Sequence, residues 1–307
     1  MHRYKAASIA LLATLPSPEH AKISTYEAFG KILYDLAGDK KSELARRIVT
    51  TAPDVTQSTN LGGWVNRRGL FSRDEKADTF RAQQIPSAQK WEFKDGGQPF
   101  ELGIAENNLF VMLGALGLSA SVFGERLFPI GTLYDPFIAR VLDALNYACY
   151  QDARFMVFAT PAGITLAPEG GAHQSISTPM IGMGQPGLTS FEPAYADELA
   201  EIMAWGFHHM QDDDGGSVYL RLSTRPIEQQ KRKMTQALRD GIRQGGYWRH
   251  KPKDAESPIL IYAGAIAPDA DAAAAQINGA GLLASTSADR QIVNWPSNAS
   301  PSWIAKL

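Results

Sequence analysis

The strongest constraint on the fold of this chain is an alternation of strand-like and helix-like segments that begins at Phe100. The strand-like segments, among them LFPIG, RFMVFAT, GLTSF and SVYLRL, are apolar almost without interruption. Strands of this kind are buried on both faces, as in parallel sheets that carry helices on each side. The alternation therefore predicts an α/β fold, with a parallel sheet covered by helices on both faces.

Glu106 marks the start of the first helix in this alternation, which we expect over residues 106–119. The residues after it are apolar almost all round, so the helix is predicted to be buried. A carboxylate at this place has two interpretations. It is either a charge favoured by the helix dipole or a chemical group held where the chain enters the core.

Two further polar clusters are expected beside Glu106, because open α/β sheets place ligands at the carboxyl ends of their strands. One is the turn Tyr134-Asp135-Pro136-Phe137, directly after the strand LFPIG. The other is the loop Glu169-Gly170-Gly171-Ala172-His173-Gln174-Ser175. A histidine in such a loop is either a candidate acid, base or hydrogen-bond donor, or an ordinary surface residue.

Composition and missing motifs exclude several classes of protein. The net charge is −2 with acidic and basic residues well mixed, so we expect no binding to nucleic acid or to an anionic membrane. No apolar run approaches the roughly 18 residues that span a bilayer. The single cysteine, Cys149, excludes an internal disulfide and a cysteine-based metal site. The sequence has no G-x-S-x-G, no G-x-x-x-x-G-K-[ST], and no G-x-G-x-x-G after a strand.

Changes in composition predict four regions along the chain. Residues 24–226 hold the main α/β pattern, and the polar, basic residues 227–256 are expected to be a linker. Residues 257–307 restart the strand–helix pattern and are expected to be part of a second α/β domain. Residues 1–23 imitate a signal peptide but lack a clear cleavage site, so we expect a linker from an upstream domain and a cytoplasmic protein.

Taken together, the clusters resemble the pyrimidine-binding, or middle, domain of the homodimeric type of pyruvate dehydrogenase decarboxylating component. This family belongs to the transketolase-like thiamine-diphosphate enzymes. The resemblance extends from about Ser24 to Ser223 and rests on the ordered motifs ARRIVTTAPDV, ELGIAEN, YDPF, PEGGAHQS and SFEPAYADELAEIM. The last motif is the most specific to the family.

The resemblance implies cofactor-binding roles for five residues. Glu106 matches the glutamate that hydrogen-bonds a ring nitrogen of the cofactor's aminopyrimidine, and Phe137 matches the aromatic residue that stacks on that ring. Tyr134 matches a neighbour that lines the same pocket, and Ile104 matches the apolar residue close to the folded cofactor. Asp54, in the turn after RIVTTAP, is also expected to face the cofactor.

Three residues are expected to be catalytic on the same grounds. Glu106 matches the residue that helps the aminopyrimidine remove a proton from the thiazolium carbon. His173 resembles the loop histidine that stabilises the developing oxyanion of the substrate or moves protons, and Glu169 lies beside it in the sequence.

One departure from the family limits what the chain can do alone. Family members hold the diphosphate and Mg²⁺ with a G-D-G motif on a separate domain, and the sequence contains no G-D-G. The resemblance therefore implies part of a pyruvate dehydrogenase, inactive by itself, that forms a homodimer and needs a diphosphate-binding domain or subunit. An acyltransferase component of a 2-oxo acid dehydrogenase complex is a further expected partner. No metal-ligating residue is assigned.

Two alternatives stay open at this point. The GGAHQS segment also fits a fragment of a transketolase or a deoxyxylulose-phosphate synthase. The missing diphosphate motif also fits a non-catalytic interaction module that keeps the fold.

Overall fold

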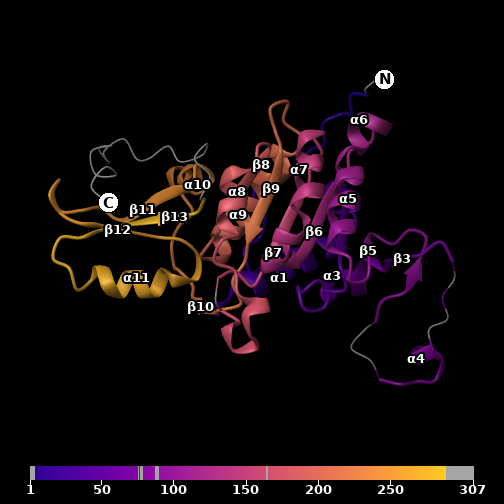
Figure 1. Cartoon of the computed structure of the whole chain (residues 1–307), viewed down its shortest axis with the longest axis horizontal. Helices are drawn as coiled ribbons and strands as arrows, with labels where there is room; N and C mark the ends of the chain where they lie inside the picture. Colours follow the sequence, from indigo (N-terminus) through magenta and orange to yellow (C-terminus); the bar gives the residue numbers. More distant parts are fainter. Residues whose placement is uncertain (1–3, 75, 77–78, 87–89, 164, 288–307) are drawn as a thin grey trace.

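The computed structural model describes residues 4–74, 76, 79–86, 90–163 and 165–287 (Figure 1). Its centre is a six-stranded sheet in which every neighbouring pair is parallel. The strands in spatial order are β5 (Pro99–Glu101), β2 (Ile48–Ala52), β6 (Phe128–Tyr134), β7 (Met156–Thr160), β9 (Ser217–Arg221) and β8 (Leu188–Phe191). The α/β fold with a parallel sheet that the sequence predicted is confirmed.

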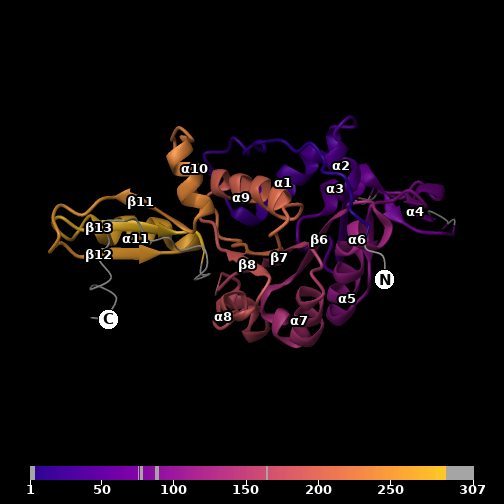
Figure 2. The same cartoon turned by 90° about the horizontal axis from the view of Figure 1, so that it is seen from above.

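Helices cover both faces of this sheet (Figure 2). On one face lie α1 (Thr25–Gly38), α2 (Glu43–Arg47), α3 (Gly62–Arg68) and α9 (Ala196–His209). On the other lie α5 (Glu106–Gly117), α6 (Ser119–Phe123), α7 (Leu142–Tyr150) and α8 (Pro179–Gly184). The buried apolar side chains accordingly form two clusters, one around Phe29 and Phe207 and the other around Phe110 and Leu145.

Helix α5 differs from the expectation in one respect. Leu109, Phe110 and Leu113 are fully buried, but Val111 is 60% exposed, so the prediction of a helix buried all round was wrong for one side. Helix α5 contacts α7 and β6, and its remaining side has no neighbouring element in the described part of the chain that buries Val111. The apolar sequence of α5 therefore leaves part of an apolar face open.

Two helical elements follow β6, and the first begins in the YDPF turn. A 3-10 segment (Asp135–Val141) comes first and α7 follows. The described residues between β2 and β5 contain α3, whose Trp64 is fully buried, and three short elements: β3 (Leu70–Phe71), α4 (Thr79–Ala82) and β4 (Phe93–Lys94). Strands β3 and β4 pair in parallel.

The C-terminal region forms a three-stranded sheet in the order β11 (Gly246–His250), β13 (Gly281–Ser285), β12 (Ile259–Tyr262). It also contains α10 (Gln236–Arg243) and α11 (Ala267–Ala274), and β10 (Ile227–Glu228) pairs with β1 (Lys22–Ile23). The expected linker, 227–256, therefore includes a strand of this sheet. Tyr247 is buried in β11, but Arg249, His250 and Lys251 follow closely, so the strand lies in a segment that looks charged and linker-like in the sequence. Residues 288–307 of the expected second domain lie outside the described residues.

The motif SFEPAYADELAEIM places two acidic side chains in the interior. Glu198 and Glu201, on α9, are almost fully buried. Glu198 accepts hydrogen bonds from Arg232 and Tyr247, while Arg239 and Arg243 bind Glu201. Burial raises the pKa of Glu198, and this outweighs the opposing effect of Arg232. These contacts attach α10 and β11 to the main sheet through α9.

Candidate functional site

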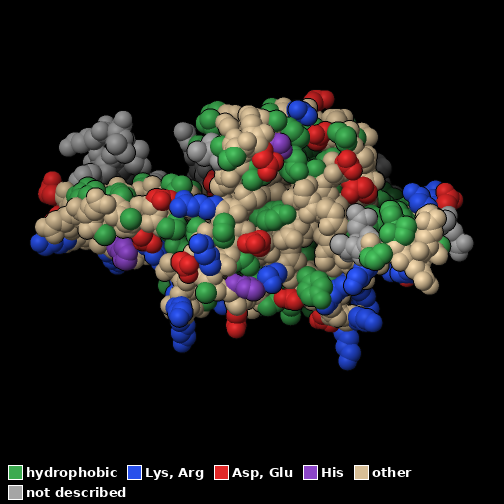
Figure 3. Space-filling model, turned by 90° about the horizontal axis from the view of Figure 1, so that it is seen from below, with side chains coloured by type: hydrophobic (Ala, Val, Ile, Leu, Met, Phe, Trp, Pro, Cys, Tyr) green, Lys and Arg blue, Asp and Glu red, His purple; other side chains and the backbone are tan. Residues whose placement is uncertain are grey.

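The predicted site residues lie at one edge of the central sheet. Asp54 follows β2, Glu106 follows β5, Tyr134 ends β6, and His173 lies in the segment after β7. Because these four strands are parallel, their carboxyl ends meet at the same edge. Figure 1 shows the central strands running downward, so Figure 3, drawn from below, views this edge. Acidic and basic side chains are interspersed on the face that Figure 3 shows.

The YDPF turn and the PEGGAHQS loop are brought together as a row of three rings. The Tyr134 ring lies 5.8 Å from the Phe137 ring and 5.4 Å from the His173 ring, between their centroids. His173 Nε2 lies 4.0 Å from a carboxylate oxygen of Glu169. His173 Nδ1 is buried and has no hydrogen-bond partner among the described residues. An unpartnered buried ring nitrogen is able to bond a ligand that enters here.

Glu106 is linked to the same row through Arg140. Glu106 is the first residue of α5, and its side chain is 14% exposed. The Arg140 Nη1 atom lies 3.6 Å from a Glu106 carboxylate oxygen, and the Arg140 guanidinium carbon lies 3.9 Å from the Phe137 ring centroid. Arg140 therefore lies against both groups that are expected to contact the aminopyrimidine.

Asp54 and Ile104 follow β2 and β5, which lie on one side of β6 in the sheet. Asp54 has a left-handed backbone, with φ of 62°, and its N–H donates to a carboxylate oxygen of Glu101 at 2.6 Å. Glu101 also bonds the Thr56 hydroxyl, and burial raises the pKa of Glu101. Ile104 exposes 82% of its surface, so an apolar side chain meets solvent two residues before Glu106. The Asp54 turn is thus fixed by a carboxylate that the sequence analysis did not single out.

A buried polar network lies beneath the rings and was also missed. Asp135, which is fully buried, accepts hydrogen bonds from Thr178, Tyr219 and Arg221. Arg221 also bonds Glu192. Two features of the sequence could have indicated this network. One is the aspartate followed by proline at the end of a strand, and the other is the arginine in the otherwise apolar segment YLRL. Arg140 had a weaker signal, as a lone cation in an apolar turn.

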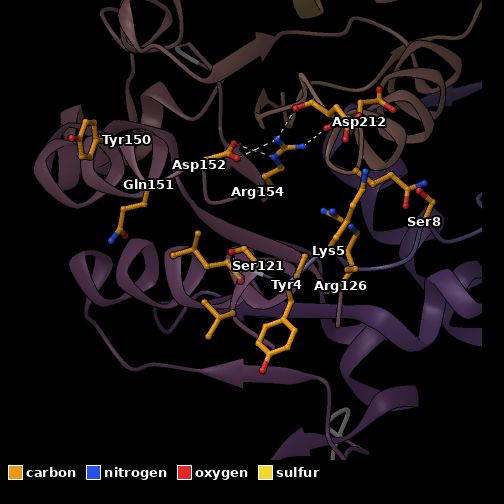
Figure 4. A pocket seen from close by; sticks show the side chains of 17 residues that line it. Tyr4, Lys5, Ser8, Ser121, Arg126, Tyr150, Gln151, Asp152, Arg154 and Asp212 are labelled. Carbon is orange, nitrogen blue, oxygen red and sulfur yellow. Dashed lines mark hydrogen bonds and ion pairs between the residues drawn. The ribbon is translucent and has the colours of Figure 1, made fainter. Parts of the chain in front are cut away.

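A cavity of about 730 Å³ lies elsewhere in the described part of the chain (Figure 4). The C-terminal ends of α5 and α7, helix α6 and the turn after α9 line it, together with the N-terminal segment that contains Tyr4 and Lys5. These helix ends lie at the amino edge of the sheet, opposite the rings. Inside the cavity, Arg154 is held by Asp152 and by the carbonyl of Asp212. This cavity is therefore separate from the candidate site.

The described residues contain neither a candidate membrane-spanning helix nor a candidate metal cluster. None of the described helices is long and apolar enough to cross a membrane. Among the same residues, no group of three or more His, Cys, Asp or Glu side chains is arranged to hold a metal ion.

Comparison with known proteins supports the resemblance seen in the motifs. A sequence model of the pyruvate dehydrogenase E1 component middle domain matches residues 13–227. The chain is 28% identical over 269 residues to the pyruvate dehydrogenase E1 component of Mycolicibacterium smegmatis, covering 86% of this chain and 28% of that protein. Its match to the Escherichia coli protein is 27% identical over 228 residues, covering 74% and 25%. The chain thus spans about a quarter of the length of these relatives.

Solved structures show the same fold. The transketolase from Leishmania mexicana aligns with a TM-score of 0.70 and 18% identity, covering 93% of this chain and 37% of that chain. A split-gene transketolase, described as an inactive β4 tetramer, aligns with a TM-score of 0.54 and 23% identity, covering 86% and 71%. At these identities the likeness shows the fold alone. The predicted resemblance is confirmed by the family match.

Proposed function

Because the chain belongs to the family of the pyruvate dehydrogenase E1 component middle domain, we propose that it supplies the aminopyrimidine half of a thiamine-diphosphate site. The complete enzyme is then a 2-oxo acid dehydrogenase component that decarboxylates pyruvate. One observation carries the proposal. A helix-start carboxylate, two aromatic rings and a histidine with an unpartnered buried nitrogen converge at one edge of the sheet.

These residues fit an aminopyrimidine, which is a flat aromatic ring with nitrogen atoms on its rim. Glu106 would hydrogen-bond a ring nitrogen and hold the proton exchanged there. Phe137 and Tyr134 would lie against the ring and keep water from it. The exposed Ile104 would be buried against the bound cofactor, and Asp54 would face it from the end of β2.

The loop after β7 would act on the substrate. When bound, thiamine diphosphate supplies the carbon nucleophile and the electron sink that decarboxylation of a 2-oxo acid requires. His173 would donate a hydrogen bond or a proton to the substrate oxygen, since its Nδ1 atom has no partner in the described chain. Glu169, beside His173 Nε2, would hold the imidazole in orientation.

The remaining half of the site would come from outside this chain. The diphosphate and Mg²⁺ would be held by a domain or subunit that corresponds to the rest of the longer relatives. Exposed apolar side chains on α5, α7 and α8 support a covering partner: Val111, Leu142, Tyr147, Tyr150 and Met180. We propose a homodimer that includes the diphosphate-binding part and is inactive without it; the inactive split-gene tetramer is a parallel. An acyltransferase component would be its partner in a complex.

The test uses the chain joined to a diphosphate-binding domain from a relative. The chain alone should show no saturable heat of binding with thiamine diphosphate and Mg²⁺, whereas the reconstituted enzyme should bind the cofactor and decarboxylate pyruvate. Glu106→Gln should lower kcat at least about 100-fold without unfolding the protein, because it removes a proton-transfer group. Glu125→Gln, at an exposed position away from the site, is the control. Full activity of Glu106→Gln would contradict the assigned role.

The transketolase-like fold supports a second candidate function. The reconstituted enzyme would then turn over sugar phosphates and ignore 2-oxo acids, as a transketolase or a deoxyxylulose-phosphate synthase does. A third candidate, a non-catalytic interaction module, would show neither activity even with a diphosphate-binding domain present. Parallel assays with pyruvate and a sugar phosphate separate the three.

A further inference from the structure

Arg221 binds three segments that are far apart in the sequence. It ends β9, and its side chain is 5% exposed. Its Nε atom donates to Asp135 at 3.2 Å and its Nη1 atom to Glu192. Its Nη2 atom lies 3.4 Å from the carbonyl oxygen and 3.3 Å from the hydroxyl oxygen of Ser175. The five N–H donors of a guanidinium, fixed in one plane, suit such a junction.

Two of the three partners lead to the candidate site. Asp135 lies directly after Tyr134 and two residues before Phe137, so its position fixes the aromatic turn. Ser175 ends the segment that carries His173. Its backbone N–H donates to the Gly163 carbonyl at 2.9 Å, and its hydroxyl accepts from the Gly163 N–H at 3.0 Å. Arg221 therefore holds the base of the histidine loop.

The third partner leads to the C-terminal region. The Glu192 N–H donates to the carbonyl of Thr286 at 2.8 Å, and the Gly264 N–H donates to the carbonyl of Glu192 at 3.2 Å. An added Cβ at Gly264 would lie 2.7 Å from a Glu192 carboxylate oxygen, so this approach leaves no room for a larger residue. Glu192 thus contacts the C-terminal region with its backbone and Arg221 with its carboxylate.

Charge makes Arg221 hard to replace. Asp135 is fully buried and Glu192 is mostly buried. Arg221 is the cation paired with both carboxylates in the described part of the chain. Without Arg221 these buried charges would be uncompensated, and the segments that carry them would move apart or take in water.

We propose that Arg221 is the positioning residue of the site, which holds the aromatic turn and the histidine loop together and couples both to the C-terminal region through Glu192. A change at the Glu192–Thr286 contact would therefore move the rings of Tyr134 and His173 relative to each other. That these rings bind an aminopyrimidine rests on the proposed function, but the mechanical coupling does not.

Hydrogen–deuterium exchange of the purified chain tests the coupling without cofactor or activity. In Arg221→Met, amide exchange should rise at least about tenfold in three segments, 134–138, 165–178 and 262–266, while α1 and β2 keep their protection. Arg221→Lys should give an intermediate rise, because lysine keeps the positive charge but lacks the planar guanidinium that bonds several partners at once. Arg232→Met is the matched control: it removes another buried arginine, bound to Asp197 and Glu198, and should leave 165–178 unchanged.

Two results would overturn the proposal. One is unchanged exchange in 165–178 in folded Arg221→Met, and the other is an equal rise throughout the sheet. If Arg221→Met does not fold, the substitutions Asp135→Asn and Glu192→Gln are added to it, because they remove the two carboxylate charges left without a partner. Amide exchange in the same three segments is then compared. In the reconstituted enzyme, Arg221→Lys should lower kcat more than it raises KM. Failure of the proposed function would abolish that assay but leave the exchange result standing.

Discussion

At the scale of single residues, Arg140 is the side chain that most affects the candidate site. It lies against the Glu106 carboxylate and one face of the Phe137 ring, and its own side chain is 61% exposed. A ligand placed between the carboxylate and the ring would have to displace it. Both contacts are weak, because the Arg140 guanidinium is exposed to solvent and lies 3.6 Å from the Glu106 carboxylate; we take about 1 kcal/mol or less for each.

Arg140→Gln is therefore expected to tighten cofactor binding. Releasing about 1 kcal/mol of competing contact corresponds to a roughly fivefold lower Kd for thiamine diphosphate in the reconstituted enzyme. Isothermal titration calorimetry measures it. Arg46→Gln, at an exposed arginine on α2, should leave the Kd unchanged. Weaker binding by Arg140→Gln would show that Arg140 holds the cofactor.

Glu198 gives a prediction about pH. Burial raises its pKa in the folded chain above the ordinary value of 4.5, so the folded state binds this proton more tightly than the unfolded state. Its effect on the free energy of unfolding is most favourable below pH 4.5 and declines as the pH rises through the raised pKa. Arg232 keeps its ion pair with Asp197 in Glu198→Gln, so this variant reports the effect of the Glu198 charge alone.

Urea unfolding at several pH values from 4 to 8 checks this expectation. Relative to wild type, Glu198→Gln should gain stability as the pH rises above 4.5, because only the wild type then carries the buried charge. Glu125→Gln, at a side chain that is 72% exposed, should follow the wild-type curve. Parallel curves for wild type and Glu198→Gln would contradict the raised pKa.

At the scale of elements, close packing of α5 on β6 sets the position of Glu106. A Cβ added to Gly131 in β6 would lie 2.6 Å from one methyl carbon of Leu113 and 3.2 Å from one of Leu109. Gly131→Ala should therefore push α5 outward and destabilise the chain by about 1–3 kcal/mol. Urea unfolding measures the loss. Gly96→Ala, where nothing lies within 4 Å, is the control and should change stability little.

Some helices, strands and site residues could be predicted from the sequence, and others could not. Continuous apolar runs identified β6, β7, β8 and β9 of the parallel sheet, because strands buried on both faces need no polar residue. Strand β11 was missed, since a half-exposed edge strand with charged neighbours looks like a linker. The three ring residues were found through their motifs. The contact between Arg221 and Asp135 could not be predicted, because the two residues are 86 positions apart and only the folded sheet brings them together.

At the scale of the whole molecule, the apolar residues left open on α5, α7 and α8 predict self-association. Tyr147 and Tyr150 stack on each other and are 61% and 85% exposed. Sedimentation should show a dimer or larger species, and the pair of substitutions Tyr147→Lys and Tyr150→Lys should shift it toward monomer by adding charge to a face that needs apolar contact. Tyr34→Lys, at an exposed tyrosine on the opposite face, is the control. A wild-type monomer at micromolar concentration would contradict the proposed homodimer.

The pairing of β1 with β10 has a consequence for how the chain folds. Lys22 and Ile23 pair with Glu228 and Ile227, and the Tyr26 N–H, in the first turn of α1, donates to the carbonyl of Ser223. The beginning of the first helix is thus held by residues that lie about two hundred positions later in the sequence. During synthesis on the ribosome, the N-terminus of α1 gains these contacts only after the strands of the main sheet have been made. We therefore expect this domain to complete its folding late in synthesis.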